Sequence, residues 1–198
     1  MSLFIPTYFS PVSQYSEIIK SNTITFEVED NFQKQTYRNR CYIYGANGKQ
    51  LLNVPVSHPP SHQRKKTKDT LVSNESDWQR HHFKSIQIAY RSSPFFEFYE
   101  DDLARIFTKK YNYLLDLSID TFLFFNDALE LEKKYERTVE YLVESPLQDF
   151  RRLACVKQEK MHSFKPYIQV FDEKHGFIEN LSMLDLLFME GPNSFSYL

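Results

Sequence analysis

The stretch from Ser76 to Tyr99 constrains the fold most, because it contains clear signals for two helices and for the corner between them. Ser76 followed three residues later by Gln79 has the spacing of a capping box, which starts a helix. Ser93-Pro94 ends this helix and suits the first turn of the next one, because proline has no backbone N–H to donate inside a helix. We therefore predict a helix, a sharp corner and a second helix.

One face of the first helix is apolar but carries one ionisable side chain. At 100° per residue the apolar stripe consists of Trp78, His82, Ile86, Ala89 and Tyr90. One interpretation is that His82 is a core residue whose ring nitrogens are held by hydrogen bonds. The other is that His82 lines a pocket and exchanges a proton with a ligand, which makes it the candidate catalytic residue.

The length and composition favour one compact domain spanning residues 1–198. Aromatic residues make up 16% of the chain and the formal net charge is −2, which is typical of a globular protein. This slightly acidic balance argues against nucleic acid as a partner, because phosphate binding requires a concentrated positive field. We expect the basic run at 64–68 to be a solvated loop.

The sequence predicts no export signal, no membrane span, no metal site and no cofactor. Cys41 and Cys155 lie far apart, which favours a reduced, cytoplasmic protein over a disulfide-rich one. No stretch approaches 18 consecutive apolar residues, and the N-terminus lacks a basic region followed by an apolar one. His58 and His62 would suit a metal only on a helix, and Pro59-Pro60 excludes a helix there. The sequence leaves the oligomeric state open.

Residues 3–9 predict a first strand, which leads through Ser10-Pro11 into a helix at 12–20. The turn between them contains no glycine, so it is not a glycine-rich phosphate loop. It is either a ligand site at a strand end or a plain connection. The polar residues that would line it are Tyr8, Ser10, Gln14 and Tyr15.

Residues 23–30 alternate apolar and polar side chains, which predicts a half-buried strand. Glu27 and Glu29 share its polar face. They suit acid–base chemistry or cation binding, but a solvated strand face is the simpler explanation.

Residues 34–56 predict a β-hairpin, because Asn47-Gly48 separates two runs rich in strand-forming residues. On the first arm Arg38 and Arg40 share a face, where they could clamp a phosphate or a carboxylate. Ion pairing with Glu27 and Glu29 on a neighbouring strand is the alternative. Asn39 lies among apolar neighbours on the other face, so its amide must find hydrogen-bond partners.

The rest of the chain completes an α/β pattern. The further predicted elements are a short strand at 69–73, a helix at 111–134, strands at 137–143 and 166–171, and a closing helix at 180–190 with Ser182 and Asp185 at capping-box spacing. We therefore predict an α/β fold: a single domain with a small mixed sheet that includes the Asn-Gly hairpin, and a helical half from 76 to about 135.

Several of these segments together resemble the WbqC-like family of bacterial proteins. The matching motifs are Pro-x-Tyr-Phe-x-Pro at 6–11, Gln-Thr-Tyr-Arg-Asn-Arg at 35–40, Trp78 with His82 and Tyr90, Ser-Pro-Phe-Phe-Glu-Phe-Tyr at 93–99, and Tyr-Ile-Gln-Val-Phe-x-x-x-His-Gly-Phe-x-x-Asn-Leu-Ser at 167–182. Many relatives begin with His-Gln-Pro where this chain reads Phe4-Ile5-Pro6, so no role of that histidine is carried over.

The resemblance, and not any spacing in this chain, implies a setting in the biosynthesis of surface polysaccharides of the O-antigen type, because relatives occur in gene clusters for such glycans. The polar residues that match the family's motifs are Tyr8, Asn39, Arg40, Trp78, His82 and Tyr90.

Two functional hypotheses follow. In the first, the protein is a transferase-type enzyme that acts on a nucleotide-activated or amino sugar, with Arg40 neutralising phosphate and His82 transferring a proton. In the second, it is a non-catalytic component that holds an anionic small molecule or a partner protein. A buried structural network without any ligand is a third possibility. The ligand-binding candidates are Tyr8, Arg38, Asn39, Arg40, Trp78 and Tyr90.

Overall fold

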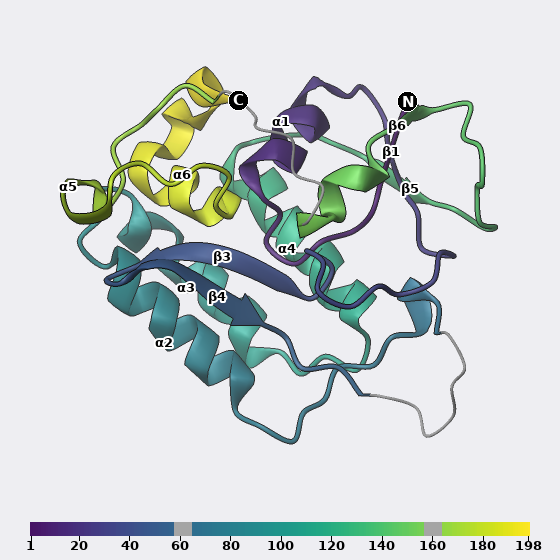
Figure 1. Cartoon of the computed structure of the whole chain (residues 1–198), viewed down its shortest axis with the longest axis horizontal. Coiled ribbons are helices and arrows are strands. Elements are labelled where there is room, and N and C mark those ends of the chain that lie inside the picture. The colour runs from purple at the N-terminus through teal and green to yellow at the C-terminus, as the bar shows by residue number, and fades with distance from the viewer. Residues whose placement is uncertain (58–64, 157–163) are drawn as a thin grey trace.

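The computed structural model describes residues 1–57, 65–156 and 164–198. The described chain forms a four-stranded parallel sheet, a separate two-stranded antiparallel sheet and helices packed around both (Figure 1). The predicted α/β class is therefore confirmed, with the hairpin standing as a sheet of its own. His58 and His62 lie outside the described residues.

The larger sheet has the strand order β5-β2-β1-β6, and all neighbouring strands are parallel. Its strands are short: they are β1 (Ser2–Phe4), β2 (Ile24–Phe26), β5 (Tyr135–Arg137) and β6 (Gln148–Asp149). β1 and β2 occupy the two inner positions. The strand predicted at 3–9 is thus shortened to Ser2–Phe4. The strand predicted at 137–143 is found earlier in the chain, at Tyr135–Arg137.

Both faces of β1 and β2 are buried, which corrects the prediction of a half-buried strand at 23–30. Glu27 has no exposed surface and Glu29 is 8% exposed. Inner strands of parallel sheets are covered on both faces, and here aromatic residues of α4 (Leu114–Ala128) pack against β2. The polar residues after β2 therefore find partners inside the protein instead of in water.

The helices of the described chain are α1 (Val12–Lys20), α2 (Trp78–Tyr90), α3 (Phe96–Thr108), α4, α5 (Asp172–His175) and α6 (Met183–Glu190), with the 3-10 segments η1 (Thr67–Asp69), η2 (Arg151–Ala154) and η4 (Gly191–Tyr197). The buried side of α2 is the predicted stripe. Within the described ranges, no helix combines the length and the apolar character needed to cross a lipid bilayer.

The predicted capping box at the start of α2 does not form. Asp77 is the N-cap and makes no side-chain cap bond, while the Gln79 amide donates instead to the Lys109 carbonyl at the end of α3 (2.7 Å). At α6 the N-cap prediction holds, since Ser182 Oγ accepts from the Leu184 N–H (3.2 Å). At α2, the bond from Gln79 to the end of α3 thus takes the place of the predicted bond within the capping box.

The hairpin consists of β3 (Arg40–Gly45) and β4 (Gly48–Asn53). Its closing pair is Gly45 with Gly48, so the turn residues are 46–47, and Gly48 itself takes the left-handed conformation (φ +93°). The hairpin lies between α2 and α6 and contacts both helices (Figure 1).

Two other predicted strands were wrong. Residues 166–171 form no strand and end in a turn, and residues 69–73 contribute only isolated bridges, between Leu71 and Tyr113 and between Val56 and Val72. The alternation that suggested a strand at 166–171 reflects the burial of Tyr167 and Gln169 in the core.

These two residues reach a buried carboxylate, Asp185, which the sequence presented only as a capping residue. Its oxygens accept hydrogen bonds from the hydroxyls of Tyr90 (2.8 Å) and Tyr167 (2.6 Å) and from the Gln169 amide (2.8 Å). Tyr90 in turn accepts from the backbone N–H of Tyr44 (2.9 Å). Burial raises the pKa of Asp185, and these three donors act in the opposite direction. The network joins α2, β3, α6 and the segment before α5.

We expect Tyr90→Phe to destabilise the protein, because the change leaves the Tyr44 N–H without its partner and removes one donor from Asp185. Unsatisfied buried groups cost about 1–3 kcal/mol of unfolding free energy, measured by urea denaturation. The control is Tyr99→Phe, whose hydroxyl lies 3.5 Å from the Ala128 carbonyl in a partly exposed position. Equal losses in both variants would contradict a special role for the Tyr90 hydroxyl.

Candidate functional site

The predicted site residues gather near the carboxyl ends of the inner strands, where parallel α/β sheets bind ligands. The turn 5–11 follows β1, and residues 27–30 follow β2. The segment 37–40 that leads into β3 is tied to the first turn, because the Tyr8 N–H donates to the Tyr37 carbonyl (2.9 Å). We refer to these three segments together as the sheet edge.

The turn after β1 is closed by its own side chains. The hydroxyls of Thr7 and Ser10 are 2.7 Å apart, and the Gln14 amide donates to the Ile5 carbonyl (2.8 Å). All of these side chains are buried, and Phe9 adopts a positive φ of 41° to make the turn. Of the two interpretations, this geometry favours the plain connection.

The acidic residues after β2 are paired with cations. Glu29 accepts from Lys66 and Lys68, each at 2.6 Å, and these bonds lower its pKa. This corrects the expectation that residues 64–68 form only a solvated loop. Asp30 is paired with Arg38, and both side chains are buried. Arg38 is therefore engaged inside the protein by a carboxylate that the sequence had not singled out.

Tyr8, Trp78 and His82 come together in the core. The Tyr8 hydroxyl lies 2.9 Å from His82 Nδ1, and the Trp78 ring meets the imidazole edge-on with 5.2 Å between centroids. The backbone carbonyl of Asn53 also bonds to the imidazole. Burial is the main cause that lowers the pKa of His82 to about 4, so the ring is neutral at pH 7.

Asn39 and Tyr90 are held in different places. The Asn39 amide donates to the Val54 carbonyl (2.9 Å) and to the side chain of Asn53 (3.2 Å), next to the carbonyl that bonds His82. Tyr90 points away from this group into the Asp185 network. The structure thus brings together all the predicted residues except Tyr90 around the sheet edge and the start of α2.

Buried polar atoms without a partner concentrate on the predicted residues. Seven such side-chain atoms occur in the described chain, and four of them are Arg38 Nε, Asn39 Oδ1, Arg40 Nε and Trp78 Nε1. The other three are hydroxyls. Buried polar groups are nearly always satisfied, so a group of unpaired donors and an acceptor indicates a place where water or a ligand binds.

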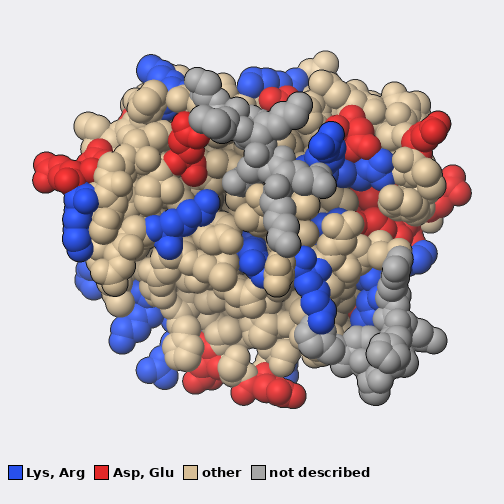
Figure 2. Space-filling view, in the orientation of Figure 1, with Lys and Arg blue, Asp and Glu red and all other residues tan. Residues whose placement is uncertain are grey.

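Arg40 differs from Arg38, although the two are only two residues apart. No ion pair or hydrogen bond joins the Arg40 side chain to the residues that the structure describes, and it is only partly buried. On the same face of the hairpin, Lys49 Nζ lies 4.4 Å from the centre of the Tyr42 ring. Figure 2 shows Lys and Arg side chains over the region of the hairpin. This face is suited to an anion.

The remaining chemistry is limited. Across residues 1–57, 65–156 and 164–198, no three His, Cys, Asp or Glu side chains are grouped so as to hold a metal ion. Asp30 and Asp185 are the important polar residues that sequence reasoning missed. An aspartate inside the apolar run 183–189 was a usable signal for Asp185, whereas nothing distinguished Asp30 from a turn residue.

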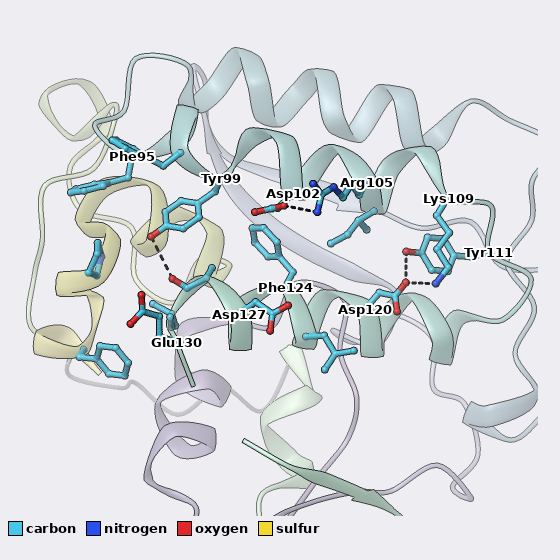
Figure 3. A pocket seen from close by; sticks show the side chains of 17 residues that line it. Phe95, Tyr99, Asp102, Arg105, Lys109, Tyr111, Asp120, Phe124, Asp127 and Glu130 are labelled. Carbon is cyan, nitrogen blue, oxygen red and sulfur yellow. Dashed lines mark hydrogen bonds and ion pairs between the residues drawn. The ribbon is translucent and has the colours of Figure 1, made fainter. Parts of the chain in front are cut away.

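A cavity of about 780 Å³ forms a groove between α3 and α4 (Figure 3). None of the predicted site residues lines it. Sequence periodicity placed both helices but gave no sign that their contact would leave a groove.

The pH dependence of stability tests the burial of His82. Because the folded-state pKa is about 4 and the unfolded value about 6.5, the unfolded chain takes up a proton first, and stability falls as pH drops from 6.5 to 4. The full contribution is about 3 kcal/mol. We expect His82→Gln to flatten this part of the curve, measured by urea unfolding at a series of pH values.

The matched control is His81→Gln, since His81 is the exposed neighbour on the same helix. It should keep the wild-type slope. A His82→Gln variant with an unchanged slope would show that the imidazole titrates normally in the folded protein.

Comparison with known proteins gives one result. Neither the curated proteins nor the solved structures contain a match to this chain. A family model, described as the WbqC-like protein family, matches residues 6–164, which include the sheet edge, the hairpin and helices α1 to α4. The chain therefore belongs to the WbqC-like protein family.

Proposed function

We propose that the protein binds the phosphate of a nucleotide-activated sugar at Arg40, and that it takes part in this way in the biosynthesis of bacterial surface glycans. The observation that carries the proposal is the unpaired Arg40 at the sheet edge. The glycan setting rests on the family, whose members occur in surface-polysaccharide gene clusters.

The contrast between the two arginines supports a ligand. Arg38 has a buried carboxylate partner, as a structural arginine requires. Arg40 has no such partner among the described residues, and its Nε is shielded from water. Leaving a buried donor unsatisfied costs about 1–3 kcal/mol, and more when the group is charged. A phosphate oxygen would remove this cost, because guanidinium and phosphate groups match in geometry and charge.

A neighbouring lysine suits the same ligand. Lys49, stacked on Tyr42, adds a second positive charge on the same face of the hairpin. Asn39 Oδ1 and Trp78 Nε1 lie on the opposite side, where both residues are buried, so they do not line the proposed phosphate site.

For Tyr8 and His82 we propose a positioning role. Both ring nitrogens of His82 are occupied, by the Tyr8 hydroxyl and by the carbonyl of Asn53, and its low pKa keeps it neutral. The pair therefore fixes the first turn against α2 and β4, beside Asn39. Proton transfer by His82, as an enzyme of this kind would use, stays a prediction and requires that the bond to Tyr8 be broken.

The proposal predicts that Arg40→Ala weakens ligand binding at least tenfold without loss of fold, because a charge-assisted contact to phosphate contributes about 1.5–3 kcal/mol. The measurement is isothermal titration, supported by thermal shift, with uridine diphosphate sugars, uridine diphosphate and inorganic phosphate. Arg40→Lys keeps the charge but loses the two-pronged geometry, so it should fall between wild type and Arg40→Ala.

The control is Arg80→Ala, which removes one exposed arginine from the outer side of α2. It should bind as wild type does. Unchanged affinity in a folded Arg40→Ala variant, or the absence of binding by wild type to all three probes, would refute the proposal.

A further inference from the structure

The groove between α3 and α4 is separate from the sheet edge. Figure 3 shows Tyr99, Asp102 and Arg105 on the α3 side and Phe124 and Asp127 on the α4 side. From Phe95 to Lys109 the wall supplied by α3 extends about 21 Å at 1.5 Å per residue. The groove is thus long.

The floor and one end of this groove are apolar. Ile106, Leu123 and Phe124 lie between the helices. At the end near the C-terminal 3-10 segment, Phe98 is 77% exposed and Phe195 is 43% exposed. Soluble proteins seldom leave such large aromatic side chains together in water, so these residues indicate a surface that a partner covers.

The rim is acidic, and part of its charge is uncompensated. Asp102 is paired with Arg105, and Asp120 with Lys109. Asp127 and Glu130 form no ion pair with any residue that the structure describes. The charged side chains that line the groove are four acidic ones (Asp102, Asp120, Asp127 and Glu130) and two basic ones (Arg105 and Lys109), a net charge of −2. The partner of this surface should therefore be positively charged.

We infer that the groove between α3 and α4 docks a basic amphipathic helix of a partner protein. Helices of three to four turns bind in apolar grooves through side chains at i, i+3, i+4 and i+7, and such a helix matches the length of this groove. Its apolar side contacts Phe98, Phe124 and Leu123. Its lysines and arginines face Asp127 and Glu130.

This docking surface is independent of the proposed ligand site. The sheet edge offers unpaired donors to an anion, while the groove offers acidic and aromatic side chains to a cation. Charge and position thus direct two different molecules to two different surfaces, and a variant of one surface should leave binding at the other unchanged.

The test uses a labelled 15-residue model peptide with leucine at i, i+3, i+4 and i+7 positions and lysine elsewhere, measured by fluorescence anisotropy at 150 mM salt. Wild-type protein should bind it, and the double variant Asp127→Lys/Glu130→Lys and the variant Phe98→Ser should each bind at least tenfold more weakly. Hydrogen exchange of the complex should show protection of α3 and α4.

Matched controls separate this surface from general attraction. Glu140→Lys/Glu144→Lys and Val139→Ser change exposed acidic and apolar residues in the loop after β5, and both should bind as wild type does. A scrambled leucine–lysine peptide and a leucine–glutamate peptide should bind at least tenfold more weakly. No binding of the amphipathic peptide, equal binding of the scrambled one, or full competition by spermidine, which would mark a small-cation site, overturns the inference.

Discussion

The carboxylate of Asp185 joins α2, the hairpin, α6 and the segment before α5 in one buried hydrogen-bond network. It lies without exposure in α6 and gathers two tyrosine hydroxyls and an amide from residues far apart in the chain. Through Tyr90 the same group reaches the backbone of β3. A buried carboxyl is stable only with such partners, so the positions of the hairpin, α2 and the C-terminal segment are all coupled to it.

The ion pairs also distinguish charged residues with a structural role from the arginine that we propose to bind a ligand. Asp30 and Arg38 pair with each other within the sheet edge, and Glu29 pairs with Lys66 and Lys68 beside it, so each contributes to the folded state. Arg40 has the same side chain as Arg38 and almost the same place in the chain, yet no residue in the described ranges pairs with it. The difference between them lies in the position of Asp30, which pairs with Arg38, and it is the reason why we propose Arg40 as the ligand-binding arginine.

Helices and the hairpin could be predicted from local signals, because periodicity and the Asn-Gly pair act over a few residues. α1 matches its predicted range, and the buried stripe of α2 was predicted residue by residue. The first and last residues of the parallel strands could not be predicted from the sequence, because strands of two or three residues are defined by their neighbours in the sheet. The roles of Arg38 and Asp185 depend on residues distant in sequence, and so does the groove between α3 and α4.

The order of the strands has a consequence for how the chain folds. β1, at the very start of the chain, pairs with β6, whose residues are 148 and 149, and β2 pairs with β5 at 135–137. Contacts of such long sequence separation form slowly, because a large loop must close before they are made. During synthesis β1 therefore cannot pair with β6 until the chain has been made as far as Gln148 and Asp149. Until then its apolar residues depend on α1, β2 and chaperones for cover.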